Sequence, residues 1–138
     1  MEGEPEDSLV ELLMSSARGL RRHWSAGLAA WGLSPHQARA LRVVSRHQPT
    51  RLGVVADHLR IAARSATEVI DGLEEQGLVH RLTDQTDRRA VLVELTDRGR
   101  RTLQEVDAAR DEQSAAHLAV LTDREQAQLA RLLRKLAP

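Results

Sequence analysis

The sequence predicts a mainly helical fold of the α+β class, a winged helix-turn-helix with flanking helices at its amino and carboxy ends. Three observations predict it. Apolar residues recur at helical spacing near both ends of the chain, two short helices with a tight turn between them occupy the centre, and two runs of strand-forming residues follow. With 138 residues, 41% of them apolar, the chain fits one domain spanning 1–138.

The first predicted helix covers about residues 9–31. Ser8 and Glu11 have the spacing of a capping box, in which each side chain bonds the backbone amide of the other residue. Apolar residues then recur every three or four positions as far as Trp31, and Gly32 supplies a stop. This pattern indicates one long helix with an apolar stripe.

A second helix is predicted over about 35–47. Ser34 is the expected cap, Pro35 suits the first helical position, and Gln37 completes a second capping box. Pro49 marks the end of this segment.

Two shorter helices form the predicted helix-turn-helix. The spacing of apolar residues from Leu52 to Leu59 predicts the first. The second covers 63–76, and Gly77 is its natural carboxy-terminal cap. Its expected inner face consists of Ala66, Val69, Ile70 and Leu73.

A β-hairpin follows the second of these helices. The runs 78–82 and 90–95 are short and rich in strand-forming residues, and a polar gap from Thr83 to Arg89 separates them, so they are expected to pair. This hairpin is the wing of the predicted fold, and its tip carries Asp87, Arg88 and Arg89.

Two helices complete the chain, over about 97–119 and 123–136. Thr96 is the cap of the first, and Thr122 with Glu125 opens the second, whose leucines form a stripe. Because the apolar stripes of the outer helices exceed what a small winged helix can cover, we expect them to dimerise. The expected parts are dimerisation helices at about 8–33 and 97–136, and a winged-helix DNA-binding region at about 34–96.

Composition narrows the classes of function. Twenty basic and twenty acidic residues give a formal net charge of zero, so binding to a polyanion requires a local cluster. The lack of cysteine excludes disulfides, thiolate catalysis and cysteine zinc sites. No apolar run has the length of a signal peptide or of the ~20 residues that span a bilayer, so we expect a cytoplasmic location and no membrane partner.

The helix-turn-helix predicts double-stranded DNA as a partner, because such a unit lays its second helix in the major groove. An arginine can pair with guanine or phosphate, a hydroxyl with either phosphate or a base edge, and a glutamate with the amino group of cytosine. The alternative is a solvated helix face. The expected DNA-binding residues are Arg64, Ser65, Thr67 and Glu68, with Arg51 as a phosphate contact at the preceding helix start.

The wing offers a second kind of DNA contact. Arg88 and Arg89 can project toward the narrow minor groove, where the negative potential is strongest, while Asp87 orients the nearby guanidinium. The alternative is a surface turn whose acidic and basic residues pair with one another.

The order of elements resembles the MarR family of transcriptional regulators over about residues 8–136. Its sharpest part is an Asp-x-Arg pattern in the wing, followed six residues later by Leu-Thr. The segments that carry the resemblance are Ile61-Ala62-Ala63-Arg64-Ser65-Ala66-Thr67, Leu73-Glu74-Glu75-Gln76-Gly77-Leu78-Val79 and Asp87-Arg88-Arg89-Ala90-Val91-Leu92-Val93-Glu94-Leu95-Thr96.

The resemblance implies a homodimer that binds a pseudo-palindromic operator, with the terminal helices forming the dimer interface. It also implies that Arg89 enters the minor groove and that Asp87 steadies it, with Arg88 placed to touch phosphate. Glu68 and Gly72 lie where many members carry basic residues, which bears on the operator preference.

Many relatives release DNA when a small, often aromatic or anionic, effector enters a cleft beside the dimer helices. The residues here that suit such a ligand are His23, Trp24, Trp31, Arg39 and Arg42. The alternative is that both tryptophans belong to the core or the dimer interface.

We expect no enzymatic activity, catalytic residue, metal site or cofactor. The six histidines form no i, i+3 or i, i+4 pair, and neither an HExxH motif nor a GxSxG or Gly-rich phosphate loop is present. The sequence therefore predicts a dimeric, effector-controlled DNA-binding regulator, more specifically a repressor. The alternatives are a winged-helix dimer that acts by binding another protein, and a metal-responsive regulator. The operator, target genes, effector and direction of control do not follow from the sequence.

Overall fold

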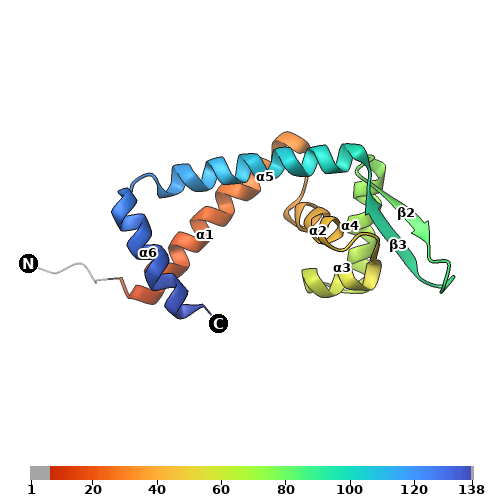
Figure 1. Ribbon diagram of the computed structural model, residues 1–138, viewed down its shortest axis with the longest axis horizontal. Coiled ribbons are helices and arrows are strands. Elements are labelled where there is room, and N and C mark those ends of the chain that lie inside the picture. The colour runs from red at the N-terminus through yellow and green to blue at the C-terminus, as the bar shows by residue number, and fades with distance from the viewer. Residues whose placement is uncertain (1–6, 138) are drawn as a thin grey trace, which may run out of the picture. The chain divides into compact units, whose positions relative to one another are not determined.

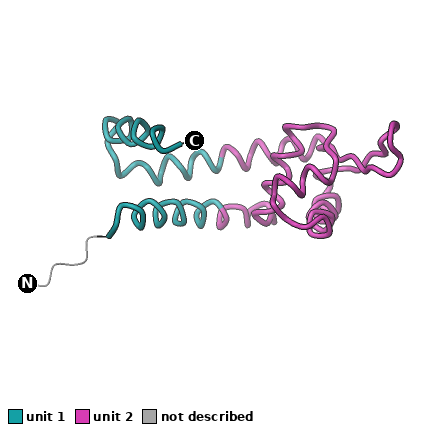
Figure 2. The backbone as a smooth tube through the Cα atoms, turned by 90° about the horizontal axis from the view of Figure 1, so that it is seen from below, with its two compact units in different colours: residues 1–24, 109–138 teal, residues 25–108 magenta. Residues whose placement is uncertain are grey.

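A computed structural model describes residues 7–137. The predicted domain span of 1–138 therefore includes residues 1–6 and 138, which lie outside the described part. Two compact units make up the described part, one from residues 7–24 and 109–137 and the other from residues 25–108 (Figure 2). The elements are α1 (Leu9–Gly27), η1 (Leu28–Trp31), α2 (Pro35–Arg46), β1 (Thr50–Arg51), α3 (Leu52–Leu59), α4 (Ala63–Glu75), β2 (Val79–Thr83), β3 (Val91–Leu95), α5 (Asp97–Leu118) and α6 (Asp123–Leu136) (Figure 1).

The predicted mainly helical α+β fold is confirmed, and all three predicted capping boxes are formed. In each box both reciprocal side-chain to backbone hydrogen bonds are present, which satisfies amide groups that a helix start otherwise leaves free. The bonds measure 2.9–3.2 Å in Ser8–Glu11, Ser34–Gln37 and Thr122–Glu125.

The prediction of one regular helix over 9–31 is wrong in its last turn. The α-helix ends at Gly27 and continues as the 3₁₀ turn of η1, after which Gly32 adopts a left-handed conformation with φ of 64°. Its amide donates to the carbonyl of Ala29 at 3.1 Å. Such tightening of a final turn satisfies terminal carbonyls, and apolar spacing alone does not distinguish it from a continuing α-helix.

The predicted hairpin of β2 and β3 is confirmed, and a third strand joins it. The antiparallel sheet has the order β1-β3-β2, with Arg81 opposite Val93 in the hairpin and Thr50 opposite Val93 on the other side. Arg51 is predicted only as a helix start, and the pairing of Thr50 and Arg51 with β3 was not predicted, because a strand of two residues has no periodicity to read.

The core of the second unit lies between α2, α3, α4 and the sheet. Leu41, Val55, Ile70, Leu73 and Val93 are completely buried there. In Figure 1 the β2–β3 hairpin extends beyond α4. None of the helices within residues 7–137 combines the length and apolarity that crossing a membrane demands.

Candidate nucleic-acid interface

The start of α4 is open to solvent and to a ligand. Arg60, in the turn before it, has a left-handed conformation with φ of 55°. Ala62 occupies the capping position but has no side chain that can accept a hydrogen bond from the first turn. Amide groups and the positive end of the helix dipole are therefore available to an anion such as phosphate.

The four side chains predicted to contact DNA from α4 all lie on its exposed face. Their neighbours Ala66, Ile70 and Leu73 are buried, so core packing fixes which face points outward. The hydroxyl of Thr67 donates to the carbonyl of Ala63 at 3.1 Å, which leaves its oxygen as an acceptor. The exposed residues are Arg64, Ser65, Thr67 and Glu68.

An arginine of the hairpin pairs with two carboxylates in the second half of α4. Arg81 of β2 contacts Asp71 at 2.5 Å and Glu74 at 2.8 Å. In the part of the chain that the structure describes, neither Arg64 nor Glu68 forms an ion pair. The first turns of α4 thus keep one free cation and one free carboxylate, which the sequence analysis expected to face DNA.

Gly72 lies beneath the side chain of Gln37. A Cβ atom at position 72 would stand 2.6 Å from the side-chain nitrogen Nε2 of Gln37. The side-chain oxygen Oε1 of the same residue accepts a hydrogen bond from the backbone amide of Ser34. A basic residue, as many family members carry here, would have to displace that flexible amide. Packing against α2 therefore accounts for glycine at this position.

The wing tip is organised by Asp87. Its carbonyl accepts from the amide of Ala90 and its carboxylate Oδ1 accepts from the amide of Arg89, both at 3.0 Å. Arg88 and Arg89 occupy the turn between these bonds and are exposed. Within the described residues the carboxylate pairs with neither guanidinium, so Asp87 fixes the backbone of the tip instead of a side chain.

Asp84 is a site residue that the sequence analysis missed. Its carboxylate accepts from the hydroxyl and the amide of Thr86, at 2.7 and 2.9 Å, and from Nη2 of Arg51 at 2.9 Å. The hydroxyl of Thr86, then its amide, the amide of Asp87 and Arg51 together lower the pKa of Asp84 to about 2. The Asp-x-Thr spacing, typical of a side-chain turn, was the available signal.

The depressed pKa of Asp84 predicts an acid-sensitive contribution to stability. Its ordinary value is 3.8, so the ionised carboxylate stabilises the fold above about pH 4, and this contribution is lost as the pH falls toward 2. We expect Asp84→Asn to melt at a lower temperature than the wild type at pH 7. Thermal unfolding followed by circular dichroism should show that difference shrinking between pH 4 and 3. A difference independent of pH would contradict this origin.

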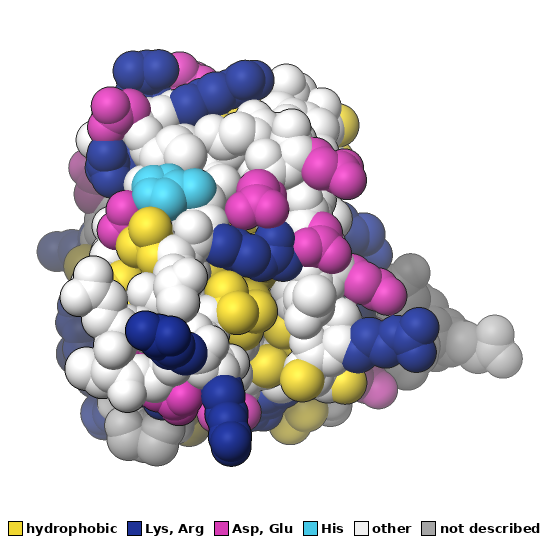
Figure 3. Space-filling model, turned by 90° about the vertical axis from the view of Figure 1, so that its right-hand side faces the viewer, with side chains coloured by type: hydrophobic (Ala, Val, Ile, Leu, Met, Phe, Trp, Pro, Cys, Tyr) yellow, Lys and Arg dark blue, Asp and Glu magenta, His cyan; other side chains and the backbone are white. Residues whose placement is uncertain are grey.

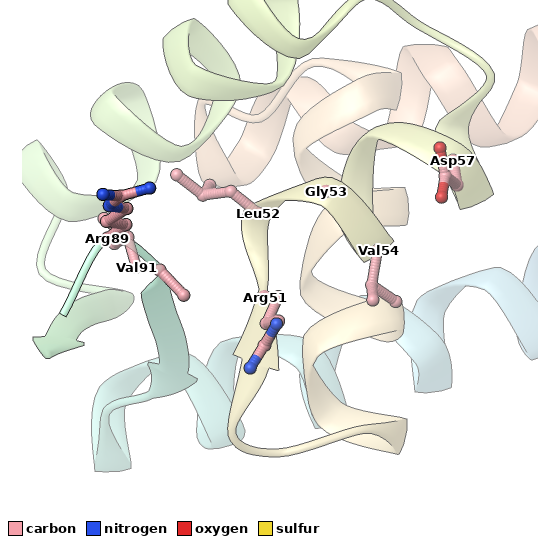
Figure 4. A pocket seen from close by; sticks show the side chains of 8 residues that line it. Arg51, Leu52, Gly53, Val54, Asp57, Arg89 and Val91 are labelled. Carbon is pink, nitrogen blue, oxygen red and sulfur yellow. The ribbon is translucent and has the colours of Figure 1, made fainter. Parts of the chain in front are cut away.

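An open pocket of about 410 Å³ lies between the start of α3 and the wing. Figure 4 shows Arg89 and Val91 on one side of it and Asp57 on the other, with Leu52 and Arg51 between them. The pocket therefore brings together two arginines, one from each of two predicted DNA-contacting elements.

Two of the predicted effector residues belong to the first unit. The indole nitrogen of Trp24 donates to the hydroxyl of Ser114 at 3.1 Å, and the guanidinium carbon of Arg110 lies 3.9 Å from its ring centre. The ring of His23 lies 6.1 Å from that of His117. Both rings thus contact α5 residues, and their role toward an effector stays a prediction.

The other three predicted effector residues belong to the second unit, and each forms a hydrogen bond with another residue of that unit. Trp31 is partly buried against the core. Each side chain donates a hydrogen bond: Trp31 to Glu105 at 3.0 Å, Arg42 to Asp107 at 3.0 Å, and Arg39 to the carbonyl of His58 at 3.4 Å.

Metal ligands do not gather anywhere in residues 7–137: no group of three or more His, Cys, Asp or Glu side chains could hold an ion. The nearest approach of two histidines, His47 and His58, puts their ring centres 5.1 Å apart. Figure 3, which faces the wing, shows Lys and Arg interspersed with Asp and Glu, in keeping with the zero net charge. Any DNA contact here must come from individually placed arginines.

Comparisons with known proteins agree with this geometry. The model of the MarR family matches residues 33–91. The HTH-type transcriptional repressor MdtR of Bacillus subtilis (strain 168) is 31% identical over 106 residues, which cover 77% of this chain and 68% of that protein. A mutant of MepR from S. aureus has the same fold, with a TM-score of 0.87 at 19% identity over 94% of this chain and 96% of its own. So has a MarR mutant from E. coli complexed with operator DNA, with a TM-score of 0.74 at 24% identity over 94% of each chain.

Proposed function

The chain belongs to the MarR family of transcriptional regulators, and we propose that it is a homodimeric repressor that binds a pseudo-palindromic operator and releases it when a small molecule binds. Its relative MdtR is named a transcriptional repressor, which supports repression. The complex of an E. coli MarR mutant with operator DNA supports DNA as the partner.

One observation carries the proposal: the two elements that we propose to contact DNA, the first turns of α4 and the wing turn, lie exposed in the same compact unit. The first turns of α4 present Arg64 and Glu68 without ion-pair partners in the described chain, and the wing turn presents Arg88 and Arg89. An α-helix fits the major groove, whereas an arginine on a hairpin tip fits the minor groove. Contact with both grooves would compensate for the zero net charge.

Exposed apolar stripes support the homodimer. α1 and α6 contain no buried residue, although both are amphipathic. A second copy is the partner that a regulator of a two-fold symmetric operator requires, and an isologous contact would cover the same stripe on each subunit. The exposed apolar residues are Leu9, Val10, Leu12, Leu13 and Met14 in α1, and Leu129, Leu132, Leu133 and Leu136 in α6.

Control by an effector would be geometric. The two α4 helices of a dimer must reach successive major grooves about 34 to 36 Å apart, so a ligand that favours another spacing weakens binding. A coupling free energy of about 1 to 3 kcal/mol is typical of such control. The predicted effector residues have rings and cations that suit an aromatic or anionic molecule, and they are His23 and Trp24 in the first unit and Trp31, Arg39 and Arg42 in the second.

The test is binding to the DNA that flanks the chain's own gene, measured over a salt series for the wild type and Arg89→Ala. We expect salt-steep binding, and a loss of about 1 to 3 kcal/mol in the variant with the dimer intact, because Arg89 lies on an exposed turn. Arg131→Ala, an exposed arginine of α6, is the matched control and should bind like the wild type. Equal affinity of wild type and Arg89→Ala would remove the minor-groove role.

A second candidate function is a winged-helix dimer that acts by binding another protein. The zero net charge and the exposed carboxylate of Glu68 favour it. Salt dependence separates the two functions, because phosphate contacts release counterions and lose affinity steeply as salt rises. Wild-type protein that binds no DNA above a random-sequence control would favour this second function.

A further inference from the structure

Asp84 lies where β2 ends and the wing loop, residues 84–90, begins. The residue is only 8% exposed, although it precedes a fully polar turn. Its amide donates to the carbonyl of Ala90 at 3.4 Å, which closes the base of the loop. The backbone of Asp84 is therefore held at the end of the sheet while its side chain faces the loop.

One oxygen of this carboxylate organises the wing loop. Oδ1 accepts from both the amide and the hydroxyl of Thr86, at 2.9 and 2.7 Å. The turn that Asp87 makes around Arg88 and Arg89 follows immediately. Because the two turns are consecutive, the orientation of the arginine-bearing tip depends on how Asp84 holds the start of the loop.

The other oxygen holds Arg51, which lies 33 residues away in the chain. Oδ2 accepts from Nη2 of Arg51 at 2.9 Å. The Arg51 side chain is 54% exposed, and within residues 7–137 its guanidinium has no other hydrogen-bond partner. A guanidinium held at one edge keeps its remaining N–H groups in a fixed plane, which suits a phosphate oxygen.

We propose that Asp84 is a positioning residue of the DNA interface, whose single carboxylate holds the wing loop and orients Arg51, so that the wing and the start of α3 engage the same DNA together. This inference rests on the proposed DNA binding. It assigns no DNA contact to Asp84 itself. The substitution that tests it is Asp84→Asn, because an amide keeps the shape but has one acceptor oxygen and cannot serve both Thr86 and Arg51.

A purely electrostatic role for Asp84 predicts the opposite sign. If the carboxylate only neutralised Arg51, removing its charge would leave an extra positive charge beside the DNA and would tighten binding. If it positions Arg51 and the loop, the same substitution weakens binding despite the gain in charge. The sign of the change thus separates the two roles.

The first experiment measures binding by fluorescence anisotropy to a duplex that the wild type has selected from a random pool. Asp84→Asn should bind about ten-fold more weakly, and the magnitude of the negative slope of log affinity against log salt should decrease by about 2, as expected when one phosphate contact is lost in each subunit of the dimer. Asp107→Asn is the matched control, because Asp107 pairs with Arg42 at 3.0 Å and the charge change is the same. Binding of Asp84→Asn as tight as the wild type, or tighter, overturns the proposal.

A double-mutant cycle tests whether Asp84 acts through Arg51. We expect Asp84→Asn to cost less affinity in an Arg51→Ala background than in the wild type, because one of its two tasks no longer exists there. An equal cost in both backgrounds would show that the ion pair plays no part in binding and would overturn the coupling.

Hydrogen exchange without DNA separates failure of this inference from failure of the proposed function. In Asp84→Ala, which removes the acceptors of both Thr86 and Arg51, the amides of residues 85–90 should exchange faster, while those of α2 keep the wild-type rate. Unchanged exchange in the wing loop overturns the inference even if the wild type binds DNA. Faster exchange, in a protein whose wild type binds no duplex, contradicts the DNA function but supports Asp84 as the residue that holds the loop.

Discussion

Gly99→Ala is expected to lower the free energy of unfolding by about 2 kcal/mol or more. A Cβ atom at this position would lie 1.9 Å from the carbonyl oxygen of Leu78 and 2.9 Å from its carbonyl carbon. That carbonyl already accepts the amide of Thr96 at 3.1 Å, and Leu78 is buried, so neither side can move freely. Overpacking of this kind costs about 1 to 3 kcal/mol, and more when backbone must shift.

Helix propensity alone predicts the opposite sign for this substitution. Gly99 lies in the first turn of α5, where alanine is intrinsically better than glycine by up to about 1 kcal/mol. The steric clash with Leu78 outweighs this gain, so we expect net destabilisation. Chemical denaturation of wild type and variant at one protein concentration measures it.

The control for Gly99→Ala is Gly53→Ala in the first turn of α3. Apart from its chain neighbours and the backbone of its own helix, no heavy atom of residues 7–137 would lie within 4 Å of a Cβ atom at position 53. The same chemical change should there be neutral or slightly stabilising. Equal stability of the two variants would mean that the contact of α5 with Leu78 is not tight, and would contradict the packing argument.

Local signals accounted for most of what the sequence could predict. A capping box such as Ser34 with Gln37 spans four residues, and the hairpin pairs runs only eight residues apart, so each could be recognised within a short window. The 3₁₀ turn at Leu28–Trp31 was missed because α and 3₁₀ turns have nearly the same apolar spacing over four residues.

The sequence predicted which residues of the interface are exposed, but not which side chains bond one another. Exposure of Arg64, Glu68 and Arg89 followed from helix and hairpin periodicity. The bond between Arg51 and Asp84 joins residues 33 positions apart, and no local pattern specifies which carboxylate an arginine will meet. Only the sheet, which sets β1 beside β3, brings them together.

Most of the predicted effector residues also form hydrogen bonds with residues distant in sequence, which no local pattern predicts. Trp24 is a predicted effector residue because its ring suits an aromatic ligand, yet its indole nitrogen donates a hydrogen bond to Ser114, 90 residues away. A side chain with a partner in its own chain can still contact a ligand, but it must first exchange or share that bond. The tryptophans are therefore weaker evidence for an effector site than the sequence suggested.

Replacing Leu132 and Leu136 of α6 with alanine is expected to dissociate the proposed dimer and, with it, operator binding. The two side chains are 44% and 72% exposed and lie one turn apart on the apolar stripe. Covering each contributes roughly 1 to 2 kcal/mol, and each counts twice in a two-fold dimer, so the loss is about 4 kcal/mol or more. This corresponds to at least a thousand-fold increase in the dimer Kd. Sedimentation velocity over a concentration series measures it.

Arg131→Ala with Lys135→Ala is the matched control for the leucine pair. These residues have the same spacing on the opposite, exposed face of α6, and alanine preserves helix propensity in both double variants. The control should remain dimeric and bind DNA. A monomer presents one α4 to one half-site, whereas a dimer binds both half-sites at once. The leucine variant should therefore lose the additional affinity that binding two half-sites together provides. A leucine variant that sediments as a stable dimer would place the interface elsewhere, whereas a monomer with full operator affinity would show that dimerisation and DNA recognition are independent.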